Sequence, residues 1–155
     1  MEFSVTILEL FEQSSLRQIY WAERIAEGDW RAAKYLGELL KKNAFRERYG
    51  ADGRVLLLTE EDDLVSFCTL VWQDEINDES LFPWIGFVYT SPRYRGNRYS
   101  QRLIDHACVL AKAQGHTQIY LSSDEQGLYE KYSFTLWRQM ETIGGESTQV
   151  FVRTL

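Results

Sequence analysis

The segment Val88-Tyr-Thr-Ser-Pro-Arg-Tyr-Arg-Gly-Asn-Arg-Tyr-Ser-Gln-Arg-Leu-Ile104 carries the strongest structural signal in this sequence. An apolar strand leads here into a basic turn containing Gly96, and the turn leads into an amphipathic helix. The first turn of a helix has backbone N–H groups without intrahelical partners and lies at the positive end of the helix dipole. Arg93, Arg95 and Arg98 add positive charge around it. The segment therefore predicts a site for a phosphorylated ligand, and a pyrophosphate is the anion that suits it best.

Downstream of this turn, apolar residues recur at helical spacing until Gly115, which is expected to end the helix. These residues are Tyr99, Leu103, Ala107, Leu110 and Ala111. Residues 117–122 predict a short buried strand, and residues 125–132 predict a short helix with Ser123 or Asp124 as N-cap. The chain is expected to finish as a hairpin of residues 134–140 and 149–155, turning through Gly144-Gly145.

Upstream of the turn, the sequence predicts strands at residues 2–9, 54–59, 64–72 and 82–90. The second and third of these strands form a hairpin across an acidic turn. Two helices lie between the first and second strands. One begins at Ser14 or Ser15 and runs to about Ala26, and the other follows Gly28 with Asp29 as its N-cap.

The predicted elements follow the order β-α-α-β-β-β-α-β-α-β-β. This order indicates an α/β (α+β) fold with a mixed, mostly antiparallel, twisted sheet of about seven strands and helices on both faces. A chain of 155 residues is long enough for one compact domain and too short for two of ordinary size, so residues 1–155 are expected to form a single domain.

The composition excludes several classes of function. A formal net charge of −6 argues against nucleic-acid binding, and no apolar run approaches the length of a membrane span. Cys68 and Cys108 lie in apolar runs and are expected to be buried free thiols, which is typical of a reducing compartment. The sequence therefore predicts a soluble, cytoplasmic protein without a bound metal.

Two motifs resemble those of the GNAT superfamily of acetyl-CoA-dependent N-acetyltransferases, and the resemblance covers nearly the whole chain in element order. The first is the family's Arg/Gln-x-x-Gly-x-Gly/Ala turn, which corresponds here to Arg95-Gly-Asn-Arg-Tyr-Ser100 and follows Pro92. The second is its Tyr-Glu-Lys-x-Gly-Phe segment, present here as Tyr129-Glu-Lys-Tyr-Ser-Phe134.

The resemblance implies that acetyl-CoA is the co-substrate and that an amine-bearing small molecule or peptide accepts the acetyl group at a primary amine. The fourth strand would pair with the pantetheine amides through Val88 and Thr90, and Tyr129 would protonate the departing thiolate. The CoA pyrophosphate would bind the backbone amides of Arg95, Gly96, Asn97, Arg98, Tyr99 and Ser100. Dimerisation is frequent in this family, so a homodimer is a further expectation.

The sequence departs from the family pattern at two important positions. Arg98 stands where the motif normally has glycine, and Trp84 stands where some members place a catalytic glutamate. The general base therefore stays open, and the sequence offers Asp74, Glu75, Asp78 and Glu79 as carboxylates that could act through water, or no dedicated base at all. Trp30 and Trp84 are expected to border the acceptor site.

Two alternative functions follow from these departures. One is a non-catalytic, CoA-binding or regulatory domain, and the other is an acyltransferase that uses a longer acyl-CoA. The acidic run 74–79 is either a solvated loop or a surface that attracts a cationic amine.

Overall fold

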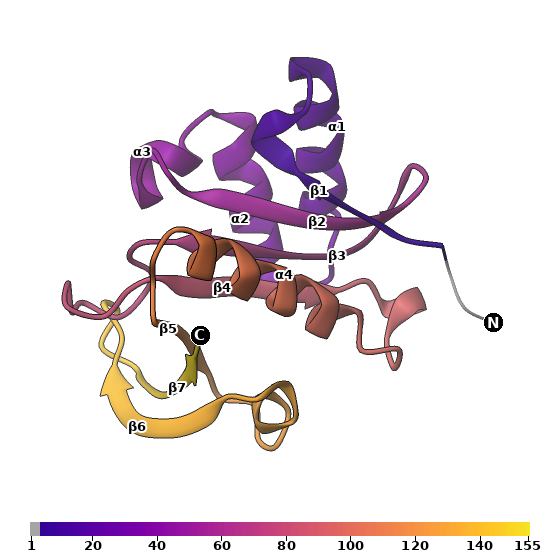
Figure 1. The fold of residues 1–155 in the computed structure, drawn as a ribbon. Helices are drawn as coiled ribbons and strands as arrows, with labels where there is room; N and C mark the ends of the chain where they lie inside the picture. Colours follow the sequence, from indigo (N-terminus) through magenta and orange to yellow (C-terminus); the bar gives the residue numbers. More distant parts are fainter. Residues whose placement is uncertain (1–3) are drawn as a thin grey trace.

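A computed structural model describes residues 4–155 of the protein. A seven-stranded sheet with the order β1-β2-β3-β4-β5-β7-β6 forms its centre (Figure 1). Its strand pairs are antiparallel except for β4 and β5, which run parallel. The predicted mixed, mostly antiparallel sheet is therefore confirmed.

The elements have the following bounds. The strands are β1 (Thr6–Glu9), β2 (Arg54–Glu60), β3 (Asp63–Val71), β4 (Trp84–Thr90), β5 (Gln118–Ser123), β6 (Thr135–Glu141) and β7 (Ser147–Thr154). The α-helices are α1 (Ser15–Ala26), α2 (Arg31–Lys41), α3 (Phe45–Tyr49) and α4 (Tyr99–Ala113). The 3₁₀ helices are η1 (Leu10–Glu12), η2 (Pro92–Tyr94) and η3 (Tyr129–Tyr132). Residues 2 and 3 of the predicted first strand lie outside the described residues.

Local capping accounts for the start of one helix and corrects the prediction for another. Ser14 caps α1 as predicted, because its hydroxyl accepts a hydrogen bond from the backbone N–H of Arg17 at 3.3 Å. Asp29 was expected to cap α2, but the N-cap residue is Trp30, without a side-chain hydrogen bond. The carboxylate of Asp29 instead accepts a hydrogen bond from the Tyr89 hydroxyl on β4.

Two further predictions of local structure are corrected. Residues 125–132 were expected to form one helix, but only Tyr129–Tyr132 is helical, as a 3₁₀ turn. Gly127 has φ = 80°, which interrupts a right-handed helix at this point. The short helix α3 was not predicted, because five residues are too few to show a helical period.

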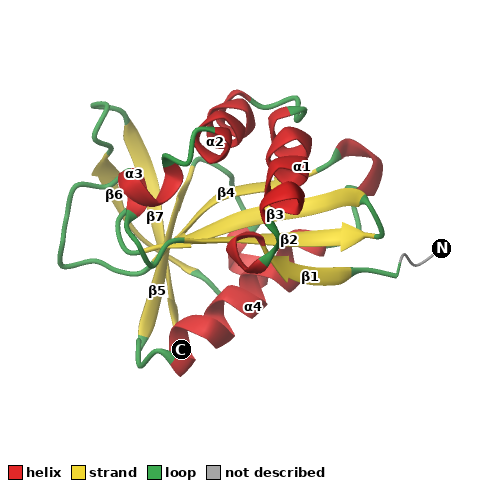
Figure 2. Cartoon of the chain, turned by 90° about the horizontal axis from the view of Figure 1, so that it is seen from above, coloured by secondary structure: helices red, strands yellow, loops and turns green. Residues whose placement is uncertain are grey.

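The helices cover both faces of the sheet, as predicted (Figure 2). One core cluster packs β2, β3 and β4 against α1, α2 and α3, and Trp21, Phe45 and Trp84 are among its fully buried members. The other packs the opposite face against α4 through residues such as Leu103 and Ile104. No helix in the described residues is long and apolar enough to cross a membrane.

The parallel strands β4 and β5 separate after a short contact. In the described part of the chain, their register contains only Trp84 opposite Tyr120 and Ile85 opposite Leu121. The later residues of β4 still pair with β3, where Tyr89 lies opposite Phe67 and Thr90 opposite Ser66. Within residues 4–155, one edge of β4 therefore has no strand partner over its second half.

A bulge in β4 coincides with this separation. The register with β3 shifts between Phe67 and Thr69, and Phe87 has φ = 50°. A bulge locally bends a strand and redirects its side chains, and bulges are common beside active sites. The middle strand of the sheet, β4, is therefore irregular and has strand partners on both edges over only part of its length.

Candidate active site

A cleft of about 1490 Å³ opens where β4 and β5 separate. β4, the turn before α4, the end of β5, η3 and the loop between α1 and α2 all contribute to its lining. Eight of the predicted site residues line the cleft: Val88, Thr90, Arg95, Gly96, Arg98, Tyr99, Ser100 and Tyr129. The structure thus brings together residues from two motifs that are about 30 positions apart in the sequence.

The turn between β4 and α4 has two residues with left-handed backbone conformation. Gly96 has φ = 89° and Arg98 has φ = 55°. A Cβ added to Gly96 would meet no atom of the described residues within 4 Å, so glycine is favoured there by conformation rather than by space. In residues 4–155, no side chain caps the N-terminus of α4. An uncapped helix N-terminus that borders a cleft is an arrangement suited to phosphate.

Arg98 occupies the position where glycine was expected. Its left-handed conformation costs an L-residue about 1 kcal/mol. The backbone therefore keeps the shape that a glycine would adopt, and the exposed Arg98 side chain borders the cleft. A guanidinium at this place can bind a phosphate with two parallel hydrogen bonds.

Two predicted members of the turn lie elsewhere. The Asn97 side-chain amide donates to the backbone carbonyls of Tyr94 and Arg95, at 3.1 and 3.4 Å, and does not line the cleft among the described residues. Arg93 lies 3.6 Å from the Asp63 carboxylate at the start of β3. Only two of the three arginines therefore border the cleft.

Arg95 joins the turn to the loop between α1 and α2. Its Nε donates to the backbone carbonyl of Thr90 at 2.9 Å, and its terminal nitrogen lies 3.4 Å from the Asp29 carboxylate. The Tyr89 hydroxyl donates to the same carboxylate. This hydrogen bond, with the nearby charge of Arg95, lowers the pKa of Asp29. The arrangement ties the α1–α2 loop to the end of β4.

Tyr129 lies at the end of the cleft formed by η3. The side chain is only 5% exposed, and burial raises the pKa of Tyr129 to about 12, although a hydrogen bond with Ser123 opposes the rise. The phenol is therefore protonated at neutral pH and able to donate. The Ser100 hydroxyl lies 3.1 Å from that of the neighbouring Tyr132, which connects η3 to the start of α4.

The sequence model of a known protein family matches most of this chain. Residues 14–134 match the sequence model of the Acetyltransferase (GNAT) family. The chain belongs to the GNAT family of acetyltransferases. A search of curated proteins found no match.

Solved structures show the same GNAT fold. A Desulfovibrio desulfuricans protein assigned to the GNAT family has a TM-score of 0.72 at 12% identity, with 97% of this chain and 99% of that chain covered. PaiA N-acetyltransferase from Thermoplasma acidophilum, in complex with coenzyme A, has a TM-score of 0.63 at 16% identity, covering 99% and 100%. A GNAT acetyltransferase from Elizabethkingia anophelis, with acetyl-CoA bound, has a TM-score of 0.65 at 13% identity, covering 97% and 98%. The fold of this chain is therefore one that has been solved with coenzyme A and with acetyl-CoA bound in other proteins.

The position that some GNAT members use for a catalytic glutamate is part of the core in this chain. Trp84 is fully buried, its indole N–H donates to the backbone carbonyl of Leu81 at 2.7 Å, and its ring packs 5.4 Å from that of Tyr120. It does not line the cleft among the described residues, so the expectation that Trp84 borders the acceptor site is wrong. Trp30 does line the cleft.

The loop between β3 and β4 brings a carboxylate to β4. Of the four candidate carboxylates, Asp74 and Glu75 line the cleft, while Asp78 binds the backbone and hydroxyl of Ser80. A Cβ added at Gly86 would overlap Oδ2 of Asp74. The carboxylate therefore occupies space that any other residue at position 86 would fill.

Burial changes the acidity of this carboxylate. Asp74 is half-buried as a residue, but burial of its carboxyl group, together with the nearby charge of Glu75, raises the pKa of Asp74 to about 7. A carboxylate with such a pKa can accept a proton near neutral pH, as a general base must. The sequence did contain a signal for this contact, because Gly86 lies within a predicted strand. A glycine in a strand often marks the close approach of another group.

The same end of the cleft carries aromatic rings that were not predicted as a group. Phe87, on the bulge of β4, lies 6.4 Å from the ring of Trp30, 6.5 Å from Tyr35 and 6.0 Å from Tyr49. Trp30 also stacks on Tyr89 at 5.9 Å. We call Trp30, Tyr35, Tyr49 and Phe87 the aromatic cluster.

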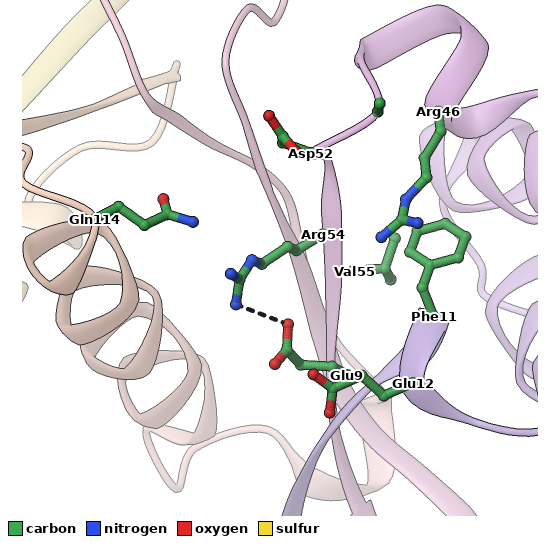
Figure 3. Close-up of a pocket in the computed structure, with 9 residues that line it drawn as sticks. Glu9, Phe11, Glu12, Arg46, Asp52, Arg54, Val55 and Gln114 are labelled. Carbon is green, nitrogen blue, oxygen red and sulfur yellow. Dashed lines mark hydrogen bonds and ion pairs between the residues drawn. The ribbon is translucent and has the colours of Figure 1, made fainter.

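A second, smaller cavity of about 320 Å³ lies between η1, β2 and the end of α4 (Figure 3). Arg54 forms an ion pair with Glu9 at 3.0 Å. Arg46 stacks its guanidinium 4.0 Å from the ring centre of Phe11 and donates to the backbone carbonyl of Gly53 at 3.2 Å. The two guanidinium groups therefore already have partners within the protein, and we assign no chemistry to this cavity.

Proposed function

We propose that this protein is an N-acetyltransferase that moves an acetyl group from acetyl-CoA directly to a primary amine. The pyrophosphate would lie at the turn of residues 95–100 and the N-terminus of α4, with Arg98 beside it. The pantetheine amides would pair with the open edge of β4 at Val88 and Thr90. The thioester would then lie near the β4 bulge.

The residues of the cleft can perform a direct transfer through a tetrahedral intermediate. The bound ammonium first loses one proton to solvent, and the neutral amine nitrogen then attacks the thioester carbonyl carbon and passes a second proton to the Asp74 carboxylate, directly or through water. A backbone N–H near Val88 stabilises the negative oxygen. The carbon–sulfur bond then breaks, and the departing thiolate takes a proton from the Tyr129 hydroxyl. The proton on Asp74 and the proton lost by Tyr129 are later exchanged with solvent.

No covalent intermediate on the enzyme is required. Both cysteines are buried, as the sequence predicted, and burial raises the pKa of Cys68 to about 12 and of Cys108 to about 11. A buried neutral thiol is a poor nucleophile. The direct route is therefore the one that the side chains support.

The observation that carries this proposal is the position of the two titratable groups within one cleft. Tyr129 and Asp74 both line the space between β4 and β5: the Tyr129 phenol is protonated at neutral pH and can donate, and the pKa of Asp74 near 7 lets its carboxylate accept a proton. A domain that only binds CoA has no use for such a pair.

The test measures acetyl-CoA binding by calorimetry and thiol release with a panel of primary amines. Tyr129→Phe should keep the acetyl-CoA affinity and lose about 10²-fold in kcat, because general acid catalysis is removed. Tyr120→Phe is the matched control, since its hydroxyl bonds Gln118 outside the cleft. Binding without thiol release from any amine would show instead a non-catalytic CoA-binding domain.

A further inference from the structure

Two large rings of the aromatic cluster are exposed to solvent beside the cleft. Trp30 is 37% exposed and Tyr35 is 47% exposed, although both pack against Phe87. An exposed indole and an exposed phenol that share one neighbour form an apolar surface that a flat ring can cover. Trp30 and Phe87 line the cleft directly.

A polar group complements this surface at Gly86. The hydroxyl of Thr69, which lies opposite Gly86 on β3, is buried and has no hydrogen-bond partner among the described residues. A Cβ added at Gly86 would lie 3.1 Å from this hydroxyl and would overlap the Asp74 carboxylate. Of these two groups, only the Asp74 carboxylate lines the cleft, and a primary ammonium can donate charge-assisted hydrogen bonds to it there.

The other charged groups near the aromatic cluster have partners within the protein, among them Arg48, whose guanidinium lies 4.9 Å from the ring centre of Tyr49. Asp29 is bound by Tyr89 and Arg95, and Glu75 accepts a hydrogen bond from Ser122 at 2.7 Å. Asp124 and Glu125 also line the cleft, but from the loop after β5, across the separation from the aromatic cluster. Beside the rings, the structure therefore offers a place for one ammonium rather than for two.

We infer that the acceptor is an arylalkylamine: a primary ammonium joined by a short chain to an aromatic ring. The ammonium lies at Asp74, and the ring covers Trp30, Tyr35 and Phe87. This inference rests on the proposed function, because it names the acceptor of the same reaction.

The test compares 2-phenylethylamine with 1,4-diaminobutane as acceptors in the thiol-release assay. We expect kcat/KM for 2-phenylethylamine to exceed that for the diamine by about tenfold or more, since each aromatic contact adds a factor of several. Trp30→Ala should lower kcat/KM about tenfold for 2-phenylethylamine alone, and Trp30→Phe should restore most of it. Trp72→Ala is the matched control, because Trp72 is 50% exposed and stacks on Phe82 away from the cleft.

A preference for the diamine, or an equal loss with both amines in Trp30→Ala, would overturn the inference. Failure of the proposed function is detected separately by calorimetry of 2-phenylethylamine with the protein–CoA complex. If no amine releases thiol, amine binding that is weakened by Trp30→Ala but not by Trp72→Ala still supports the aromatic site. Absence of that binding would overturn it.

Discussion

The two ends of the cleft differ in whether backbone or side chains form them. The end at α4 is made mainly of backbone, with Gly96 and Arg98 in left-handed conformation ahead of an uncapped helix. The end at the β4 bulge is made of side chains, among them Asp74, Trp30 and Phe87. A backbone site depends on chain conformation and tolerates a change of side chain, whereas a side-chain site changes its ligand with each substitution. We expect the first end to bind a constant ligand and the second to set specificity.

The largest expected effect is at the side-chain end. Asp74→Asn should lower kcat about 10²- to 10³-fold, because it removes the proposed base. The base acts when deprotonated, so kcat/KM of the native protein should rise with pH and change slope near pH 7, where the pKa of Asp74 lies. The variant should lack this inflection in a pH–rate profile.

Folding provides the control for this variant. The pKa of Asp74 is higher in the folded protein than in an unfolded chain, so its ionisation destabilises the fold as pH rises from about 4 to 7. The neutral amide of the Asp74→Asn variant carries no such cost, and the Tm of the variant at pH 8 should equal or exceed that of the native protein. An inactive variant with a lower Tm would contradict the assignment of Asp74 as the base and would indicate a structural role only.

A smaller effect is expected from the glycine that makes room for this carboxylate. Gly86→Ala forces Oδ2 of Asp74 away from its position, so kcat should fall about tenfold while the acetyl-CoA affinity stays unchanged. Gly144→Ala is the matched control, because its nearest neighbour to the added Cβ is Thr142 at 3.7 Å, and it should retain full activity. An unchanged kcat in Gly86→Ala would contradict the position assigned to the base.

The smallest expected effect is at the backbone end. Arg98→Gly removes the left-handed strain and should stabilise the protein by about 0.5 kcal/mol in chemical unfolding, after the entropy of the added glycine is subtracted. Arg98→Ala keeps the strain and should not be stabilised. Both variants should bind acetyl-CoA about fivefold more weakly if the guanidinium contacts a phosphate. Unchanged affinity in both would restrict phosphate binding to the backbone.

The two ends of the cleft also differ in how well the sequence predicts them. The backbone end is contiguous in the sequence, so a strand, a glycine-containing turn and a helix could be recognised together at residues 88–104. The fold was predictable for the same reason, because hydrophobic periodicity is local. The predictions were wrong where a side chain binds a residue distant in the sequence instead of a local partner. Asp29, for example, binds Tyr89 instead of capping α2.

The side-chain end could not be assembled from the sequence. Trp30, Asp74 and Phe87 come from three separate segments, and the bulge that brings Phe87 to its neighbours depends on pairing with β3. Trp30 and Trp84 looked alike as candidates in the sequence, yet one lines the cleft and the other is buried. Only the tertiary structure distinguishes such pairs.

The most direct test of the account is a calorimetric titration of acetyl-CoA into two glycine variants. Gly96 and Gly115 lie at opposite ends of α4, with φ values of 89° and 95°, and a Cβ added at either would meet no atom of residues 4–155 within 4 Å. Each alanine substitution should cost about 1 kcal/mol of stability. We predict one-to-one binding to the native protein and to Gly115→Ala, and binding at least about tenfold weaker to Gly96→Ala, because its amides are displaced. Equal binding by both variants, or no binding by the native protein, would contradict the assignment of the turn as the CoA site.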